Sequence, residues 1–401
     1  MTTPTAIRTS LLALAYFAFI SLGLPDGLIG VGWPSISAEF GVPTEAVGLL
    51  LFAGTAGYLT SSVAAGFTIA RLGVGWLLAG STALASLALA GYAISPGLGL
   101  MVPCALLAGL GGGAIDSGLN AYAAGAFGPK HMNWLHAFFG LGVALGPLIM
   151  TTVIGAGLSW RWGYATVASA QATLALAFVL TARSWADRHP VIDPLLPLDP
   201  IVAVRKRDTL ALPAVWLGVL AFAIYVAIEV AAGLWAFLLL TEGRGVSATV
   251  AGICVSGYWA SLFVGRVVQG VVAERLGSAK VLVGSLIGIA AGSVLVAIPG
   301  PAWLAVIGLA LIGFAAAPVF PLLTLTTVDR VGAAHTDRAI GIQIAGAGLG
   351  GAVIPAAIGV LLSRTSVAAL GPALVVLSLL LLGLYLVSTR NAGTAAQGQP
   401  G

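Results

Sequence analysis

Charged residues are scarce in this 401-residue sequence, since Asp, Glu, Lys and Arg together make up 7% of it, whereas a soluble domain carries about 25%. Cysteine and histidine are also rare, with two and four copies, and their spacing gives neither a disulfide framework nor a metal-ligand motif. The sequence contains no H-E-x-x-H, G-x-S-x-G or phosphate-loop motif. These absences argue against a soluble protein, an enzyme and an ATP-driven pump.

Apolar residues dominate what is present, at 59% of the chain, with a mean hydropathy of +1.06. No soluble core can bury this much apolar sequence, so we predict an all-α polytopic membrane protein. The net charge of +4 gives no indication of nucleic-acid binding, because the cations are few and all but Arg266 are expected in loops or at the ends of spans. Long apolar runs separated by turn-forming residues predict twelve spanning helices. Their expected limits are 9–33, 46–70, 74–95, 98–127, 133–157, 161–182, 210–241, 247–273, 279–299, 302–328, 339–363 and 367–388.

One long polar segment, rich in proline and charge, separates the sixth span from the seventh. It is too short to form a domain, so we interpret it as a linker between two six-helix halves. The expected parts are an N-terminal half (1–183), a cytoplasmic linker (184–209), a C-terminal half (210–389) and a disordered tail (390–401).

The placement of Lys and Arg predicts the orientation of the chain, because cytoplasmic loops are enriched in these residues. Three arginines fall on one side: Arg161, Arg244 and Arg364. Thirteen cations fall on the other side: Arg8, Arg71, Lys130, Arg183, Arg188, Arg205, Lys206, Arg207, Arg275, Lys280, Arg330, Arg338 and Arg390. We therefore expect both termini and the linker in the cytoplasm, which also requires an even number of spans.

The two halves carry related sequence at a nearly constant offset. The stretch that starts at Gly66 after the second span matches the stretch that starts at Gly270 after the eighth, 204 residues later. Asp26 and Glu229 are 203 residues apart in the first and seventh spans. Matches that recur at an offset of about half the chain indicate two related halves. Parallel repeats of this kind typically bind their solute between the halves, near the middle of the membrane.

These motifs resemble a known family. The pattern G-x-x-x-(D/E)-R-x-G between the second and third spans of each half is similar to the signature of the major facilitator superfamily. The stretches GGGAIDSGLNAY, YVAIEVAAGLW and IGIQIAGAGLGGAVIP resemble its fucose-permease-like branch, which contains sugar:proton symporters. The resemblance covers the whole chain. It implies a twelve-helix fold that works by alternating access in a bacterial cytoplasmic membrane.

The same resemblance implies a conformational lock at the two signatures. The first signature has Ala70 where the family usually has an acid, whereas the second keeps its acid, so we expect any lock to lie in the C-terminal half. The candidate lock residues are Gly66, Arg71, Gly73, Gly270, Glu274, Arg275 and Gly277.

Asp116 is the most informative polar residue, because it lies near the middle of the fourth span. A charge at that depth costs about 2.5–3.5 kcal/mol on insertion scales, and such residues are candidates for function. At helical spacing Gly109, Gly112, Asp116 and Asn120 share one stripe, which predicts a close neighbouring helix and a polar face. We interpret Asp116 as a proton-coupling residue. The alternative is an Asp packed against hydroxyls of another helix.

Two further acids are coupling candidates. Asp26 lies in a first-span segment broken by glycine and proline, and the resembled branch uses a first-span acid in proton coupling. A solvated position near the outer mouth is the alternative. Glu229 shares a helix face with Tyr225 and Gly233. This face either lines the solute path, which makes Tyr225 a solute ligand, or braces a neighbouring helix.

The remaining solute-binding candidates are uncharged or titrate near neutrality. They are Asn120, His136, Phe139 and Gln343. An amide suits hydroxyl groups, an aromatic ring can stack on a sugar, and a histidine titrates near neutral pH. A polar, hydrogen-bonded His136 without a protonation role is the plainer interpretation.

Together these patterns predict a secondary transporter for a small polar solute, a neutral sugar or polyol, coupled to protons. Sodium remains an alternative coupling ion, and no other cofactor is expected. An anionic substrate normally needs a cationic clamp, and Arg266 is the one cation placed inside a span. The alternatives are a drug or metabolite efflux antiporter and a transport-inactive sensor or scaffold. We expect a monomer whose partners are its solute and the lipid bilayer.

Overall fold

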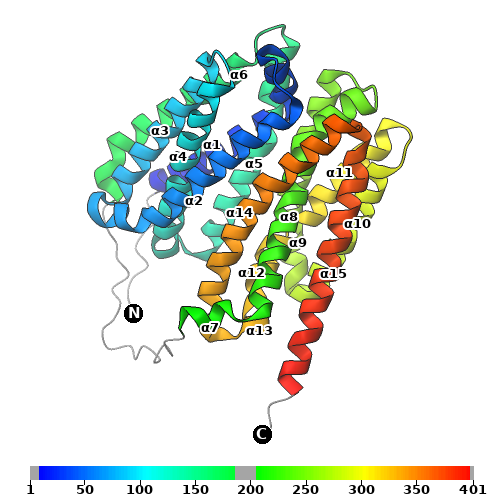
Figure 1. The fold of residues 1–401 in the computed structure, drawn as a ribbon. Helices are drawn as coiled ribbons and strands as arrows, with labels where there is room; N and C mark the ends of the chain where they lie inside the picture. The colour runs from blue at the N-terminus through cyan, green and yellow to red at the C-terminus, as the bar shows by residue number, and fades with distance from the viewer. Residues whose placement is uncertain (1–8, 186–204, 398–401) are drawn as a thin grey trace. The chain divides into compact units, whose positions relative to one another are not determined.

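The computed structural model describes residues 9–185 and 205–397. Within these ranges the chain forms helices joined by short turns, with no β-strand, as Figure 1 shows. The chain folds as two compact units. Unit 1 contains Met1–Val42 and Leu49–Leu196, and unit 2 contains Pro43–Gly48 and Pro197–Gly401.

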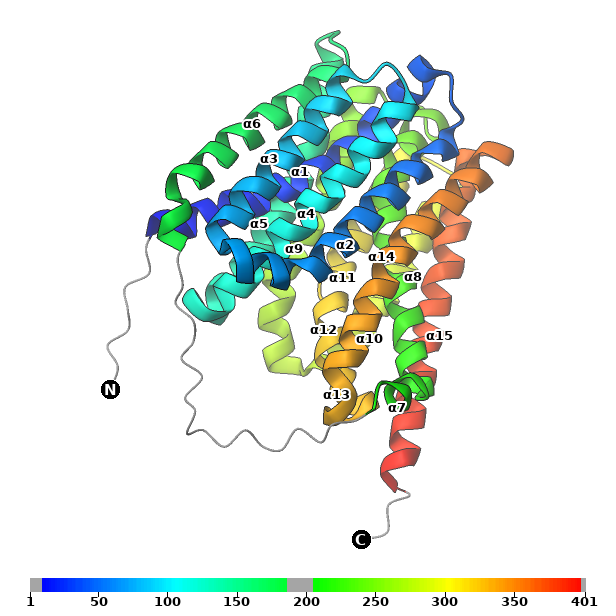
Figure 2. The same cartoon turned by 60° about the vertical axis from the view of Figure 1, so that its left-hand side comes forward.

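Unit 1 is built around two sets of packed helices. Helix α1 packs along α5, and α3 packs between α4 and α6, an arrangement that can be followed in Figure 2. A core cluster that includes Phe19, Leu78, Ile115 and Phe178 joins these helices. The helices are α1 (Thr9–Phe40), α2 (Val47–Leu72), α3 (Val74–Ile94), α4 (Leu98–Ala126), α5 (Gly128–Gly155), α6 (Arg161–Thr181) and the short η2 (Ala182–Trp185).

Unit 2 repeats this pattern. Helix α8 packs along α14, and α10 packs against both α11 and α15, which are labelled in Figure 1. The helices are η1 (Thr44–Ala46), α7 (Lys206–Leu210), α8 (Pro213–Leu238), η3 (Leu239–Gly243), α9 (Ala248–Leu276), α10 (Ser278–Ala297), α11 (Ala302–Ala316), α12 (Val319–Leu325), α13 (Thr327–Val331), α14 (Ala333–Arg364), η4 (Val367–Ala369) and α15 (Leu370–Gln397).

Twelve helical segments within the described residues are long and apolar enough to cross a membrane. Their mean hydropathies lie between 1.4 and 2.5, and each is at least 20 residues long, which matches the length that a hydrocarbon core requires. The prediction of an all-α protein with twelve spans is therefore confirmed, and the chain is an integral membrane protein.

Three expected limits need correction. The first helix continues past 33 to Phe40 with both Pro25 and Pro34 inside it, because prolines are tolerated in membrane helices where neighbours satisfy the freed backbone groups. The tenth span is interrupted near Pro318, between α11 and α12, since proline lacks an amide donor. The last helix continues to Gln397, so residues 390–397 are helical where we expected a disordered tail.

The linker expected at 184–209 lies mostly outside the described residues, which resume at 205. Its final residues form the short helix α7, which precedes α8 by two residues. A single short helix at this position is compatible with a segment that is too short to form a domain. The other residues of the expected linker, 186–204, remain a prediction.

Four glycines with positive φ angles support the internal repeat. Gly41 and Gly245 have φ angles of 62° and 68°, and they follow the first span of each unit. Gly73 and Gly277 have φ angles of 76° and 86°, and they end the signature motif. Each pair is 204 residues apart. Because side chains other than glycine rarely adopt this conformation, the repeat fixes backbone geometry as well as sequence.

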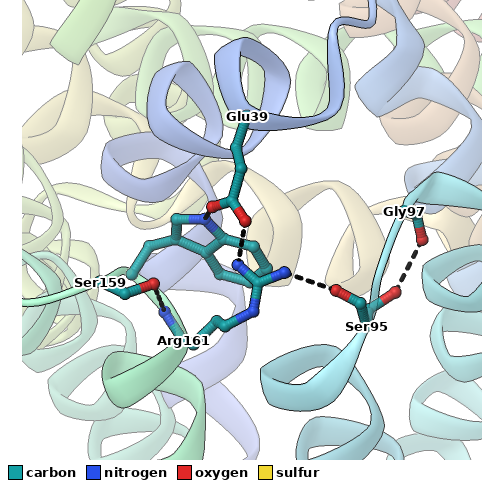
Figure 3. Close-up of polar contacts among 6 residues, drawn as sticks. Glu39, Ser95, Gly97, Ser159 and Arg161 are labelled. Atoms are coloured by element: carbon teal, nitrogen blue, oxygen red, sulfur yellow. Dashed lines mark hydrogen bonds and ion pairs between the residues drawn. The ribbon is translucent and has the colours of Figure 1, made fainter.

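An arginine caps the carboxyl end of the third span in each unit. In unit 1 the Arg161 guanidinium pairs with Glu39 and donates to the Ser95 carbonyl at 2.6 Å, as Figure 3 shows. Trp160 donates its indole N–H to the same carboxylate at 2.7 Å. In unit 2 Arg244 donates to three carbonyls at and after the end of α10, at 2.8–3.1 Å. A cation at this end of a helix also complements the helix dipole.

We expect Arg244→Gln to lower the free energy of unfolding by about 1–3 kcal/mol, because carbonyls at the end of α10 lose their donor. Arg161→Gln should cost less, about 1 kcal/mol, because its pair with Glu39 is partly exposed to solvent and screened. Thermal melting in detergent measures both. Lys280→Gln, which removes an exposed cation from the first turn of α10, is the control. An Arg244→Gln protein that melts like this control contradicts the capping role.

Candidate functional site

The polar cluster around Asp116 is the centre of the candidate site in unit 1. Asp116 lies on α4, and its carboxylate accepts hydrogen bonds from the Tyr58 hydroxyl on α2 at 2.6 Å and from the Asn120 amide at 2.9 Å. Asp116 and Asn120 are both partly buried. The contact with a hydroxyl of another helix is the one that the packing alternative predicts. Its role in coupling remains a prediction.

Two glycines of α4 bring α2 close enough for this contact. A Cβ at Gly109 would overlap the carbonyl of Gly54, and one at Gly113 would overlap the carbonyl of Tyr58. The close approach at Gly109 is the one expected from its stripe. At Gly112, in contrast, a Cβ would meet Leu22 of α1 at an ordinary 3.6 Å. Backbone contact between α2 and α4 thus places the Tyr58 phenol against Asp116.

The side-chain oxygen of Asn120 takes no part in the contact with Asp116. Its amide nitrogen donates to Asp116, while its buried carbonyl oxygen has no hydrogen-bond partner among the described residues. A buried polar atom without a partner costs free energy, so this oxygen is suited to accept a hydrogen bond from a solute hydroxyl or from water. The cluster therefore combines an acceptor, a carboxylate and a phenol within one unit.

Asp26 lies halfway along α1, and its side chain is exposed. It is within electrostatic range of Tyr58 on α2 and Tyr92 on α3. The backbone beside it is tightly packed, because a Cβ at Gly27 would overlap the Val143 carbonyl on α5. The role of Asp26 in proton coupling remains a prediction.

The two candidates on α5 lie in different surroundings. The His136 side chain is exposed, and its ring meets Phe19 of α1 edge-on with centroids 5.4 Å apart. Phe139 is partly buried and packs against the hydrophobic core of unit 1. Phe139 is therefore mainly a packing residue in this structure, whereas His136 keeps a ring surface accessible.

Glu229 is the centre of a second polar cluster, in unit 2. Its carboxylate accepts a hydrogen bond from Tyr225, one turn earlier on α8. The Tyr258 hydroxyl on α9 donates to the Glu229 backbone carbonyl at 2.8 Å. One turn later on α8, a Cβ at Gly233 would overlap the Trp259 ring of α9. The face that contains Glu229 therefore braces α9, as the alternative interpretation predicts.

Tyr225 and Gln343, which we predict as solute ligands, are buried in this structure, and their role remains a prediction. Each is 1% exposed in this structure. The Tyr225 hydroxyl lies 3.0 Å from the Ala316 carbonyl, and Gln343 accepts a hydrogen bond from Thr327 at 3.0 Å while its amide nitrogen packs beside Gly218. Both residues are enclosed by neighbouring helices here. The physical reason is close packing at α8, which a one-dimensional helical face does not reveal.

The two signature motifs are only partly described. Gly66 and Arg71 are exposed in unit 1, and Arg275 is exposed in unit 2. Gly73 and Gly277 serve as the N-caps of α3 and α10 with positive φ angles. The surroundings of Gly270 and the side chain of Glu274 lie outside the described part of the structure, so the expected lock at Glu274 remains a prediction.

Sequence reasoning missed Tyr58 and Tyr258, the tyrosines that reach the two clusters from a neighbouring helix. Tyr58 binds Asp116 and Tyr258 binds the Glu229 backbone, yet each lies on a different helix from its partner. The helical pattern of α4 or α8 contains no information on which residue of a neighbouring helix faces it. A search for tyrosines at mid-span would have found Tyr58, but it could not have paired it with Asp116.

Comparisons with known proteins agree with this architecture. The family model of the Major Facilitator Superfamily matches residues 15–243 and 217–400. The nucleoside transporter NupG is 14% identical with a TM-score of 0.73, over 94% of this chain and 99% of that chain. The fucose:proton symporter FucP from E. coli is 15% identical with a TM-score of 0.63, over 96% and 98%. A bacterial homologue of the human lysosomal transporter Spinster is 15% identical with a TM-score of 0.73, over 97% and 98%.

At these identities the solved structures establish the fold, and the family model establishes the relationship. The model covers nearly the whole chain in two overlapping matches, in keeping with its two units. Twelve spans, a repeated signature and this match lead to one conclusion. The chain belongs to the major facilitator superfamily of membrane transporters.

Proposed function

We propose that the chain is a secondary active transporter that moves a small neutral polar solute, a sugar or polyol, by alternating access and couples this movement to protons. The Asp116 cluster carries the proposal, because it places a carboxylate, a phenol and an unpartnered amide oxygen together in the membrane-spanning part of unit 1. A partly desolvated carboxylate can exchange a proton as its surroundings change between states.

The neutral-solute class follows from the groups available. The Asn120 oxygen accepts a hydrogen bond, and Tyr58 and Asp116 can exchange donor and acceptor roles with hydroxyls. Two of the structurally similar proteins are named for a nucleoside and for fucose, which are both neutral and rich in hydroxyl groups. This supports a hydroxyl-bearing ring as the solute.

Uptake into proteoliposomes tests the proposal. Labelled monosaccharides, polyols and nucleosides are offered with an inward proton gradient, with an inward sodium gradient and without a gradient. We expect accumulation of at least one of these solutes under the proton gradient alone. Accumulation driven by sodium assigns the alternative coupling ion. No movement of any solute by folded protein supports the scaffold alternative and contradicts transport.

A second candidate function is efflux of cationic compounds by an antiporter. The acids Asp26, Asp116 and Glu229 favour this function, because carboxylates in apolar surroundings attract cations. Thermal-shift measurements with neutral sugars, cationic amphiphiles and organic anions separate the two. Stabilisation by cations alone supports the exporter. Stabilisation by organic anions alone contradicts both, because neither proposal includes a cationic clamp.

We expect Asn120→Ala to raise KM for the transported solute about tenfold, because loss of a hydrogen bond at a polar site costs about 1–1.5 kcal/mol. The maximal rate should change less, since the Asp116 carboxylate remains in place. Concentration-dependent uptake measures both quantities. The control is Thr60→Ala on α2, whose exposed hydroxyl donates to the Ala56 carbonyl of its own helix. An unchanged KM removes Asn120 from the solute site.

A further inference from the structure

The short helix α7 provides a basic surface at the start of unit 2. It begins at Lys206, follows directly after Arg205, and ends two residues before the span that starts at Pro213. Figure 2 shows α7 at the same end of unit 2 as α13. The chain therefore places three consecutive cations, Arg205, Lys206 and Arg207, within a few residues of the membrane-spanning segment.

A buried threonine fixes the orientation of α7. Thr209 is fully buried, and its hydroxyl lies 3.0 Å from the His335 Nδ1 and 3.3 Å from an Arg338 nitrogen at the start of α14. This anchor turns one side of α7 toward α14. The side chains of Arg205, Lys206 and Arg207 remain exposed, so the cations face outward from a position that is held in place.

Two apolar side chains accompany the cations. Leu210 is 44% exposed and Trp216 is 49% exposed. The Trp216 indole N–H donates to the Leu210 carbonyl at 2.9 Å, which fixes the ring beside α7. Tryptophan is enriched at the level of lipid headgroups, where its apolar body and polar N–H are both satisfied. The surface thus presents positive charge next to groups that suit acyl chains.

Another cation at this end of unit 2 is used differently. Arg330 on α13 donates to the Leu323 carbonyl at 2.7 Å and to the Thr327 hydroxyl at 3.2 Å. Burial lowers the pKa of its guanidinium. Arg330 therefore supports the broken tenth span from inside. The outward cations of α7 have only the adjacent Asp208 as an acid within their own helix.

We propose that α7 and Trp216 form a binding site for the headgroup of an anionic phospholipid, with Arg205, Lys206 and Arg207 contacting the phosphate and Leu210 and Trp216 contacting the acyl chains. Clusters of cations next to a spanning helix attract anionic lipid. The site rests on the membrane fold and is independent of the transported solute. Such a lipid fastens the first span of unit 2 at the membrane surface.

The experiment compares lipid binding by purified full-length protein and two variants with equal charge loss. The test variant is Arg205→Gln/Lys206→Gln/Arg207→Gln, and the control is Arg275→Gln/Lys280→Gln/Arg364→Gln, whose cations are exposed elsewhere in unit 2. Native mass spectrometry measures retention of phosphatidylglycerol and of phosphatidylcholine. We expect the test variant to bind phosphatidylglycerol about a hundredfold more weakly, and the control to bind it within about threefold of the original protein.

Two more variants and a competitor distinguish a lipid site from a site for free phosphate. Arg205→Lys/Arg207→Lys keeps the charge and should retain binding, which distinguishes charge loss from misfolding. Trp216→Ala should weaken phosphatidylglycerol binding severalfold. Inorganic phosphate at the same concentration should not compete, because it lacks acyl chains. The proposal is overturned if the test and control triple variants lose phosphatidylglycerol binding equally. It is also overturned if inorganic phosphate competes fully with phosphatidylglycerol.

Discussion

Asp116→Asn is expected to abolish accumulation of solute against a gradient while exchange of solute across the membrane continues. An amide keeps the size of the side chain and can still accept a hydrogen bond from Tyr58 or Asn120, the two partners of Asp116, but it cannot bind and release a proton. A gradient of one pH unit supports about tenfold accumulation per coupled proton. Uptake by proteoliposomes with and without that gradient measures the loss.

The matched control is Glu39→Gln, which removes a carboxylate of the same unit that pairs with Arg161. This variant should melt at a lower temperature yet still accumulate solute. Counterflow exchange, with unlabelled solute inside and labelled solute outside, shows whether Asp116→Asn still binds and translocates. Accumulation by Asp116→Asn at the level of the original protein assigns coupling to another residue. Asp26→Asn and Glu229→Gln are then the next variants to test.

Gly142→Ala and Gly350→Ala are each expected to destabilise the protein by about 1–3 kcal/mol, because both sites lack room for a methyl group. A Cβ at Gly142 of α5 would overlap the Ile20 carbonyl of α1, and one at Gly350 of α14 would overlap the Ala223 carbonyl of α8. These contacts join the first and fifth spans of each unit. Thermal melting in detergent measures the loss.

At two other glycines we expect substitution by alanine to have the opposite effect on stability. Gly80 on α3 and Gly284 on α10 are exposed, 204 residues apart, and a Cβ at either would meet nothing within 4 Å. Because alanine favours helix by up to about 1 kcal/mol over glycine, Gly80→Ala and Gly284→Ala should leave the melting temperature unchanged or raise it. If all four variants melt alike, close packing at Gly142 and Gly350 is not a source of stability.

Much of the fold could be predicted because each spanning segment carries its own signal. A run of about 20 apolar residues identifies a span without reference to any other part of the chain, and all twelve were found in this way. The break of the tenth span near Pro318 and the extension of α1 past Pro34 were missed. Whether a proline ends a helix depends on neighbours that satisfy the freed carbonyl, and those neighbours are tertiary.

The candidate site was less predictable for the same reason. The carboxylates Asp116 and Glu229 stand out in apolar sequence because their burial is costly. Their partners do not stand out, since Tyr58 and Tyr258 resemble any aromatic residue of a membrane helix. Tyr225 shares a helical face with Glu229, and Gln343 is an amide inside a span, but the structure encloses both because α8 packs tightly against its neighbours.

The sequence alone thus determined the membrane class, the twelve spans, the repeat and the position of the intramembrane acids, because hydropathy, glycine and charge act locally along the chain. Only the tertiary structure decided which groups meet. It joined Tyr58 to Asp116 through the glycine contacts of α2 and α4, and it placed Arg161 and Arg244 on the carbonyls that end the third span of each unit. Hydrogen bonds between helices depend on register and rotation, and these are set by the packing of side chains that lie far apart in sequence.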